Sequence, residues 1–529
     1  MRAAGGYRPR RRFGPPKQPP LQTVAAKNED AGPAWGVTGL SARGYSVPKA
    51  AFDERQLAAL KKELTMVPCV PGQAAVGPEA SFPIFLESAH KLYVPKYFGL
   101  QRFGAPVRGC TIEPGEPLGE AVEFTGRLRQ EQRLPVRAFL DAARDPMRMG
   151  GILSLPCGFG KTIAALHIIA ELGTRTLVVV HKDFLLNQWR ERIREFLPAA
   201  SVGLLKAKVV DVAGRDIVIA SVQSLSMKQY GPDVFAGIGL LIIDECHRVG
   251  TEVFSRALHK TNVRYSLGLS ATVERKDGMT KAFVHFLGEV LFKGQRREDV
   301  VDVVQHRFYD DDPDYSREET IGFGPDSKPN TARMINNVCG HGARNELLVD
   351  TIVDLLRREP GRKILVLSDR KAQLRAVKDG VEAAGVSAGF YWGGMKPAAL
   401  AESETKRVMC ATFPYAAEGM DVPDLDTLLL ASPKTDIEQS CGRILRQKAE
   451  SRLRKPLIFD VVDAFSPMFQ RQAAKRRAFY KKHGYTIHGT VEQAFAGATA
   501  APEDEDDDDR DDDPSQDYAL TFVDDDECP

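Results

Sequence analysis

A glycine-rich loop at residues 155–162, LPCGFGKT, has the residue types that bind the phosphates of a nucleotide. Glycines let backbone N–H groups point inward, a lysine adds positive charge for the β- and γ-phosphates, and a threonine hydroxyl suits Mg²⁺. An apolar run precedes the loop and a helix-like segment follows it, so we expect a strand, a tight turn and a helix N-terminus. Leu155 stands where the strict pattern has its first glycine, which leaves an incidental glycine turn as the alternative. The residues expected to hold the nucleotide are Gly158, Gly160, Lys161 and Thr162.

Two adjacent carboxylates, Asp244 and Glu245, follow directly on the apolar run at residues 240–243. At a strand end, Asp244 is expected to hold Mg²⁺ and Glu245 to orient and deprotonate an attacking water. Phosphoryl transfer needs little more than a positioned phosphate, neutralised charge and a nucleophile. The alternative is a solvated turn, although an apolar strand that runs straight into the pair argues against it.

A triplet of small residues at 270–272, Ser-Ala-Thr, follows a further apolar run. We expect the hydroxyl side chains of Ser270 and Thr272 to hydrogen-bond His247. Such a bond would couple the ends of two strands.

In the second half of the chain, residues 439–446 have the sequence QSCGRILR. This spacing predicts that Arg443 and Arg446 lie on one face of a helix, at i and i+3. Guanidinium groups suit phosphate oxygens. If two domains close on one nucleotide, these residues can act as arginine fingers, which contribute ~10³–10⁵ in rate. The alternative is a basic surface helix.

Short aliphatic runs alternate with amphipathic helices from about residue 119, pause near residues 294–337, and then resume. Continuous apolar strands separated by helices indicate parallel sheets covered on both faces. We therefore predict an α/β fold with two tandem parallel-sheet domains, in which ligands bind at the carboxyl ends of the strands. The predicted strands are residues 176–180, 216–220, 240–243, 265–269, 363–367, 407–411, 427–430 and 457–462.

The chain is thus divided into five predicted segments. A small α+β module is expected before the first sheet, with a helix near residues 52–64 and strands at 82–86 and 91–94. The segments are 1–44, a disordered basic arm; 45–118, the α+β module; 119–295, the first α/β domain; 296–490, the second; and 491–529, a disordered acidic tail.

Composition indicates a globular intracellular protein. The 529 residues are 43% hydrophobic, and eight scattered cysteines without a CxxC pair favour a reducing compartment over a disulfide framework or a zinc site. No apolar run approaches the ~20 residues of a membrane helix, and no secretory signal is visible.

The net charge of +1 hides an uneven distribution. Residues 503–527 contain fifteen acidic residues and one arginine, which leaves +15 for the preceding chain, and the first twenty residues contribute +6 of that. The mildly basic remainder is compatible with a phosphate-bearing partner, and equally with a solvated surface.

Taken together, PCGFGKT, DECH, SAT and QSCGRILR resemble superfamily-2 helicases and translocases in order and spacing. These enzymes have two RecA-like domains with ATP in the cleft between them. The resemblance spans about residues 120–465. It is strengthened by stretches that resemble further family motifs, at residues 128–132, 180–189, 219–225, 367–370 and 411–423.

The resemblance implies ATP and Mg²⁺ as cofactors and gives roles to further residues. It implies that Arg129 and Gln132 recognise adenine and that Gly419 and Asp421 make further nucleotide contacts. It also implies that Gln439 is catalytic, together with the two arginines. Arg275 and Asp277 would join Ser270, Thr272 and His247 in coupling. Nucleic-acid contacts fall to Lys182, Gln223, Ser224, Arg370 and Thr412.

Finer features point to one branch of the superfamily. Residues 269–278, LSATVERKDG, resemble the extended motif of xeroderma-pigmentosum-B-type and UvsW-type DNA helicases. The α+β module and residues 476–482 are similar to helicases of large nucleocytoplasmic DNA viruses, of the poxvirus transcript-release type. Gln439 replaces the histidine of DEAD-box RNA helicases, and Cys-His replaces Ala-Asp after the acidic pair, so DNA is favoured over RNA.

The resemblance therefore predicts an ATP-dependent DNA helicase or translocase that is monomeric and acts in viral transcription or in DNA repair or replication. A transcription or polymerase complex is a candidate partner. Three alternatives remain: a double-strand DNA translocase that does not separate strands, an RNA helicase, and a transcription-complex subunit that is not a motor. The compartment is open between virion, host cytoplasm and nucleus.

Overall fold

The computed structural model describes residues 36–67, 81–156, 158–248, 251–271, 279–294, 299–321, 328–420, 422–447 and 451–495. Most of the predicted basic arm and acidic tail therefore lies outside the described residues. The chain forms two compact units. The first comprises residues 1–298, 413–424 and 438–447, and the second comprises residues 299–412, 425–437 and 448–529.

The first unit is built around an eight-stranded sheet in the order β10-β9-β11-β8-β12-β13-β7-β14. All neighbours are parallel except the β9–β10 pair. The predicted α/β class is therefore confirmed. The strands are β7 Gly150–Ser154, β8 Thr176–Val180, β9 Val202–Lys206, β10 Val209–Asp211, β11 Ile217–Ser221, β12 Leu240–Ile243, β13 Tyr265–Ser270 and β14 Val290–Lys293.

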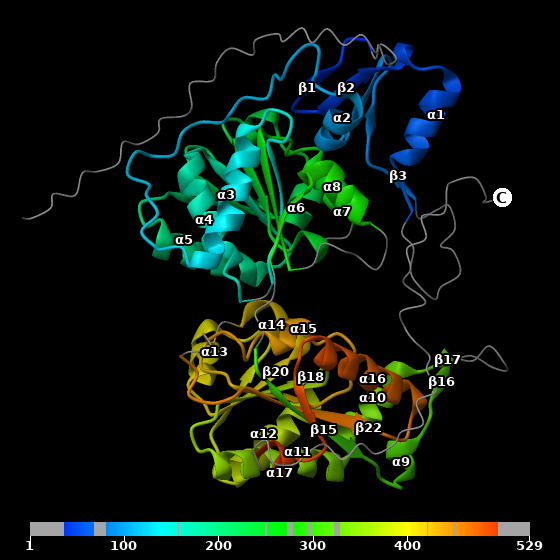
Figure 1. Cartoon of the computed structure of the whole chain (residues 1–529), viewed down its shortest axis with the longest axis vertical. Helices are drawn as coiled ribbons and strands as arrows, with labels where there is room; N and C mark the ends of the chain where they lie inside the picture. The colour runs from blue at the N-terminus through cyan, green and yellow to red at the C-terminus, as the bar shows by residue number, and fades with distance from the viewer. Residues whose placement is uncertain are drawn as a thin grey trace, which may run out of the picture. The chain divides into compact units, whose positions relative to one another are not determined.

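Helices cover both faces of this sheet, with α3, α4 and α5 on one side and α6, α7 and α8 on the other (Figure 1). Successive residues of one strand point to opposite faces. Val178 accordingly packs in the core with α3, α4 and α5, and Val179 packs in the core of the other face. The helices are α3 Gln130–Arg144, α4 Lys161–Leu172, α5 Asp183–Phe196, α6 Val222–Met227, α7 Thr251–Leu258 and α8 Thr280–Leu287.

The N-terminal module is a four-stranded antiparallel sheet in the order β1-β2-β6-β5, with two helices and a short β3–β4 pair. Its core is continuous with the α6–α8 face of the large sheet. The elements are β1 Gly39–Ser41, β2 Gly44–Pro48, α1 Glu54–Glu63, β3 Thr65–Met66, β4 Phe82–Pro83, β5 Leu86–Glu87, β6 Lys91–Val94 and α2 Lys96–Phe103.

Two predictions for this module are wrong. The chain is already folded at Gly39, within the stretch predicted to be disordered up to residue 44. The strand there was not predicted because three residues are too few to show a periodic pattern. The single strand predicted at residues 82–86 is two strands in separate sheets. Pro83 has no N–H to continue a ladder, which is consistent with β4 ending there.

The second unit has a seven-stranded, all-parallel sheet in the order β19-β20-β18-β21-β22-β15-β23. Its strands are β15 Asp302–Phe308, β18 Ile364–Ser368, β19 Ala388–Tyr391, β20 Val408–Thr412, β21 Thr427–Leu430, β22 Leu457–Asp463 and β23 Thr486–His488. Its longer helices are α10 Thr331–Gly340, α11 Gly342–Arg358, α12 Lys371–Ala383, α13 Pro397–Glu404 and α16 Pro467–Lys482. Short elements complete it: α9 Pro313–Ser316, β16 Thr320–Ile321, β17 Lys328–Pro329 and α17 Val491–Phe495. Two short helices of this half of the chain, α14 Phe413–Gly419 and α15 Glu438–Cys441, group with the first unit.

Two boundaries of the second unit differ from prediction. The stretch near residues 294–337, expected to be loops and a hinge, contains β15 between β22 and β23 and most of α10. The strand was hidden because its second half is polar: Gln305 donates a hydrogen bond of 3.2 Å to Asp460. The tail predicted to be disordered from residue 491 begins with α17, in which Phe495 packs against the core.

Two buried ion pairs hold the last long strand of this sheet. Arg344 donates to both carboxylate oxygens of Asp463 at 2.7 and 3.1 Å, and Arg476 contacts Asp460 at 2.9 and 2.8 Å. Removing one member of such a pair leaves a buried charge and costs ~3–5 kcal/mol. Arg476 belongs to the stretch that resembles viral helicases, and in this fold it is an internal anchor of α16.

No helix in the described ranges is both long and apolar enough to cross a bilayer.

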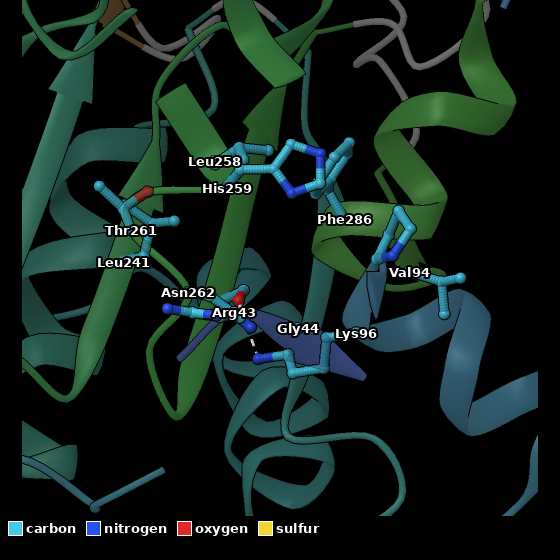
Figure 2. Close-up of a pocket in the computed structure, with 12 residues that line it drawn as sticks. Arg43, Gly44, Val94, Lys96, Leu241, Leu258, His259, Thr261, Asn262 and Phe286 are labelled. Carbon is cyan, nitrogen blue, oxygen red and sulfur yellow. Dashed lines mark hydrogen bonds between the residues drawn. The ribbon is translucent and has the colours of Figure 1, made fainter. Parts of the chain in front are cut away.

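Lys96 connects the N-terminal module to the first sheet. It is 2% exposed and lies in a pocket lined by both parts of the unit, including Gly44, Leu241 and His259 (Figure 2). Its ammonium group donates hydrogen bonds of 3.1, 3.1 and 3.2 Å to oxygens of Val263, Arg264 and Ser266. Burial lowers the pKa of Lys96 to about 7, with smaller contributions from Cys110, which raises it, and Arg264, which lowers it.

Lys96→Met is expected to destabilise the chain, and the difference from wild type is expected to grow from about pH 7 to about pH 9. The ordinary pKa of lysine is 10.5. Above pH 7 the unfolded chain therefore binds more protons than the folded chain, and the stability of the wild type rises with pH. Methionine lacks this titration. Thermal unfolding of both proteins at the two pH values measures the difference, and a difference that stays constant or shrinks would contradict the prediction.

Candidate active site

The glycine-rich loop has the predicted strand, turn and helix. It leaves the end of β7, and α4 begins at Lys161. Gly158 and Gly160 have φ of +77° and +83°, in the left-handed region that glycine adopts without strain. The N-terminus of α4 therefore follows a turn of the kind that presents N–H groups to an anion.

Gln132 and Arg129 contact this loop directly. The Gln132 amide donates to the carbonyls of Phe159 and Gly160 at 3.0 and 3.2 Å, and Arg129 donates to Gly158 O at 3.1 Å and to Phe159 O. The Gln132 carbonyl accepts the backbone N–H of Arg129 at 2.9 Å. The predicted adenine-sensing residues thus fix the shape of the phosphate loop. Their contact with adenine remains a prediction.

The acidic pair lies at the same edge of the sheet, although β13 separates its strand β12 from β7. Lys161 Nζ lies 2.8 Å from Glu245 Oε1, and both side chains are largely buried. Glu245 has φ of +48°, a strained conformation for a residue with a side chain. The loop lysine and the predicted base are therefore in contact.

Asp244 is 6% exposed, and burial raises its pKa above the usual range. The adjacent charge of Glu245 raises the pKa further, whereas Lys161 and the indole of Trp189 lower it. Trp189 Nε1 donates a hydrogen bond of 2.8 Å to Asp244 Oδ2. Sequence reasoning noted Trp189 only as part of a family motif, because nothing in the sequence says where a buried indole finds its acceptor.

The residues present fit Mg²⁺ bound together with phosphates. No cluster of three or more His, Cys, Asp or Glu able to hold a metal occurs within the described ranges. Mg²⁺ is commonly bound by one or two carboxylates plus substrate phosphates and water. Asp244 and the hydroxyl of Thr162, the second residue of α4, supply such a set.

The predicted bond between the Ser-Ala-Thr triplet and the acidic motif is confirmed for Ser270. His247 Nδ1 lies 2.8 Å from Ser270 Oγ and 3.4 Å from Glu245 Oε2. Its coupling role remains a prediction. The other residues predicted for coupling, Thr272, Arg275 and Asp277, lie outside the described residues.

The prediction that Arg443 and Arg446 lie on one face of a helix is wrong. Helix α15 ends at Cys441, so Arg443 lies in the following turn, residues 442–445, and Arg446 lies directly after that turn. Their guanidinium groups nevertheless converge on one acceptor, the carbonyl of Met420, at 2.7 and 3.1 Å. Gly442 follows α15 at once, which is consistent with the early end of the helix.

The remaining residues of this region are only partly described. Gly419 is the last residue of α14, and Asp421 lies outside the described residues. The side-chain oxygen of Gln439 is buried without a hydrogen-bond partner in the part of the chain that the structure describes.

The predicted nucleic-acid residues of the first unit gather at the carboxyl ends of β8 and β11, which are parallel neighbours. Lys182 is the N-cap of α5, and Gln223 in α6 donates to His181 O at 3.0 Å. The Ser224 hydroxyl accepts the backbone N–H of Ala207 at 2.9 Å. This contact joins α6 to the β9–β10 hairpin, which sequence reasoning missed.

The other two predicted nucleic-acid residues lie at adjacent strand ends of the second unit, because Ser368 of β18 pairs with Thr412 of β20. Arg370 follows β18 as the N-cap of α12. Its guanidinium donates to Ala332 O at 3.1 Å and to Asn336. Each sheet thus presents predicted nucleic-acid residues at its carboxyl edge.

Comparison with known proteins adds independent findings. The family model described as type III restriction enzyme, res subunit, matches residues 125–275. A protein of Acanthamoeba polyphaga mimivirus, provisionally named ATP-dependent RNA helicase, is 31% identical over 453 residues, covering 84% of this chain and 85% of that protein. An African swine fever virus protein with the same provisional name is 26% identical over 361 residues, covering 63% of this chain and 69% of that protein. The crystal structure of T4 UvsW covers 82% of this chain and 95% of its own at 16% identity, with a TM-score of 0.33.

Gly160→Ala is expected to lower the free energy of unfolding by about 1–2 kcal/mol more than Gly158→Ala. The new methyl group would displace the hydrogen bonds from Gln132 and Arg129 to the loop carbonyls, which contribute about 1 kcal/mol each. Both positions have positive φ, so both variants are strained. A Cβ at Gly160 would lie 2.3 Å from Gln132 Nε2 and 2.9 Å from Arg129 Nη2, whereas nothing lies within 4 Å at Gly158.

Denaturant unfolding of the two variants measures this difference. Gln132→Ala combined with Gly160→Ala serves as the control, since removing the obstructing amide should recover part of the extra loss. Equal losses in the two single variants would contradict the described contact between Gln132 and the loop.

Proposed function

The chain belongs to the superfamily-2 helicases, in the group that large DNA viruses encode, and on that premise we propose that it is an ATP-driven motor that moves along DNA. As a helicase of this kind it hydrolyses ATP and binds nucleic acid. The observation that carries the proposal is the contact of Lys161 and Glu245 at the end of three adjacent strands, 2.8 Å apart.

In the proposed cycle, ATP binding separates this ion pair. The phosphates take the positive charge of Lys161, and Glu245 becomes able to accept a proton from the attacking water. Asp244 and Thr162 are the residues that would hold Mg²⁺, which neutralises charge on the phosphates when bound. Asp244 is largely shielded from water, which strengthens the charge interactions of its carboxylate.

We further propose that Arg443 and Arg446 complete the site as arginine fingers. Their shared acceptor, Met420 O, holds both guanidinium groups close together. Phosphate oxygens are stronger acceptors of guanidinium bonds than a neutral carbonyl. Closure over ATP would therefore exchange the carbonyl for phosphate, and reopening would reverse the exchange and move the chain along a strand.

Phosphate contacts are proposed for Lys182, Gln223 and Ser224 in the first unit and for Arg370 and Thr412 in the second. Such contacts give affinity without reading the base sequence, which suits a motor that tracks a backbone. DNA is favoured by the replacement of two DEAD-box signatures, at Gln439 and after Glu245. The names of the two viral relatives point instead to RNA. A role in viral transcription is compatible with either nucleic acid.

Lys161→Ala and Glu245→Gln are both expected to impair ATP hydrolysis, but by different routes. Loss of the lysine should weaken nucleotide binding, whereas Glu245→Gln should still bind ATP but lower the turnover number by about 10²–10⁴-fold, because only the base is lost. Steady-state hydrolysis and equilibrium binding of a fluorescent ATP analogue separate the two effects.

Glu171→Gln is the matched control, because Glu171 is exposed near the end of α4 and its carboxylate lies 3.7 Å from His167, one turn earlier in the same helix. If both Lys161→Ala and Glu245→Gln hydrolyse ATP at the wild-type rate, the proposed site is wrong.

A further inference from the structure

The hydrogen bond between Trp189 and Asp244 joins a helix of the predicted nucleic-acid surface to the carboxylate proposed to hold Mg²⁺. Trp189 is 1% exposed, and its Nε1 donates to Asp244 Oδ2 at 2.8 Å. A buried indole N–H needs an acceptor. Here the acceptor is a carboxyl group, and in its ionised form such a group accepts a shorter and stronger hydrogen bond than a neutral oxygen does.

The indole is held rigidly, so it can fix the direction of the carboxylate. Trp189 packs in the core of the α3–α5 face with Leu185, Leu186 and Ile193 of its own helix and with Val178 and Val180 of β8. The backbone of Asp244 is tied to the same strand, since its N–H donates to Val179 O at 3.0 Å. Movement of α5 relative to the sheet would therefore turn the Asp244 side chain while its backbone stays in place.

The start of α5 is connected to the predicted nucleic-acid surface. Helix α5 follows Lys182 directly, and Asp183 forms an ion pair of 2.9 Å with Lys206 at the end of β9. The neighbouring carbonyl of His181 accepts from Gln223 of α6 at 3.0 Å. Trp189 lies seven residues after Lys182, about 10 Å along the helix at 1.5 Å per residue.

We infer that Trp189 is a positioning residue that orients Asp244 for Mg²⁺ and transmits binding of nucleic acid at the start of α5 to that carboxylate. The inference rests on the proposed function. It assigns a task to a buried residue that the proposed function does not use. A purely structural tryptophan in the same place would support the fold and leave the affinity for the ion unchanged.

The test is the Mg²⁺ dependence of nucleotide binding by the full-length chain. A fluorescent, non-hydrolysable ATP analogue is titrated with Mg²⁺ for wild type, Trp189→Phe and Trp392→Phe. Phenylalanine keeps an aromatic ring but has no N–H. Trp392 is the matched control, since it is also buried, at 9% exposure, but packs on Phe390 in the second unit.

We expect the half-saturating Mg²⁺ concentration to rise on the order of tenfold in Trp189→Phe and to stay at the wild-type value in Trp392→Phe, as is typical when a residue that orients a metal ligand is lost. An unchanged value in Trp189→Phe would overturn the inference, even if its melting temperature falls. If Trp189→Phe does not fold, benzothienylalanine at position 189 keeps the bicyclic shape without the N–H, and the same two outcomes apply.

Repeating the titration with a single-stranded DNA oligonucleotide tests the transmission. In wild type the oligonucleotide should lower the half-saturating Mg²⁺ concentration, and in Trp189→Phe this shift should be lost. An equal shift in both proteins would overturn the transmission through Trp189. If wild type shows no Mg²⁺-dependent binding of the analogue, the proposed function itself fails, and that result differs from both outcomes above.

Discussion

The parallel pairing of β7, β13 and β12 is the constraint on which the site depends. Ser154 at the end of β7 pairs with Ser270 at the end of β13, and β13 pairs in turn with β12. Because parallel strands end at one edge, the glycine-rich loop, the Ser-Ala-Thr triplet and the acidic pair must meet there. The 2.8 Å contact between Lys161 and Glu245 follows from this register, and a shift of one residue would turn the side chains to the other face.

Buried polar contacts then determine how each group points. His247 bonds to Ser270, Trp189 to Asp244, and Gln132 to the loop carbonyls. Each contact satisfies a polar group that would otherwise cost about 1–3 kcal/mol when buried. Each also links one element of the proposed nucleotide site to another element of the first unit. The arrangement suits an enzyme in which hydrolysis is to respond to events elsewhere in the chain.

The sequence predicts the sheets well and the small elements poorly. Strands such as β8 and β12 are predicted almost to the residue because both faces are buried and every position is apolar. Strand β15 was missed because its second half is polar, and β1 because it has three residues. The order of the strands, with β13 between β7 and β12, is a property of tertiary pairing that no local pattern contains. For the same reason the turn carrying Arg443 and the acceptor of the Trp189 indole were not predicted.

The central proposal is that contact with DNA stimulates ATP hydrolysis by this chain. The most direct measurement is the rate of ATP hydrolysis by the full-length protein alone and with single-stranded DNA, duplex DNA or single-stranded RNA at equal nucleotide concentration and fixed salt. The account predicts a low rate alone and a marked rise with DNA that exceeds the rise with RNA. A rate that no nucleic acid changes, or that only RNA raises, would contradict it.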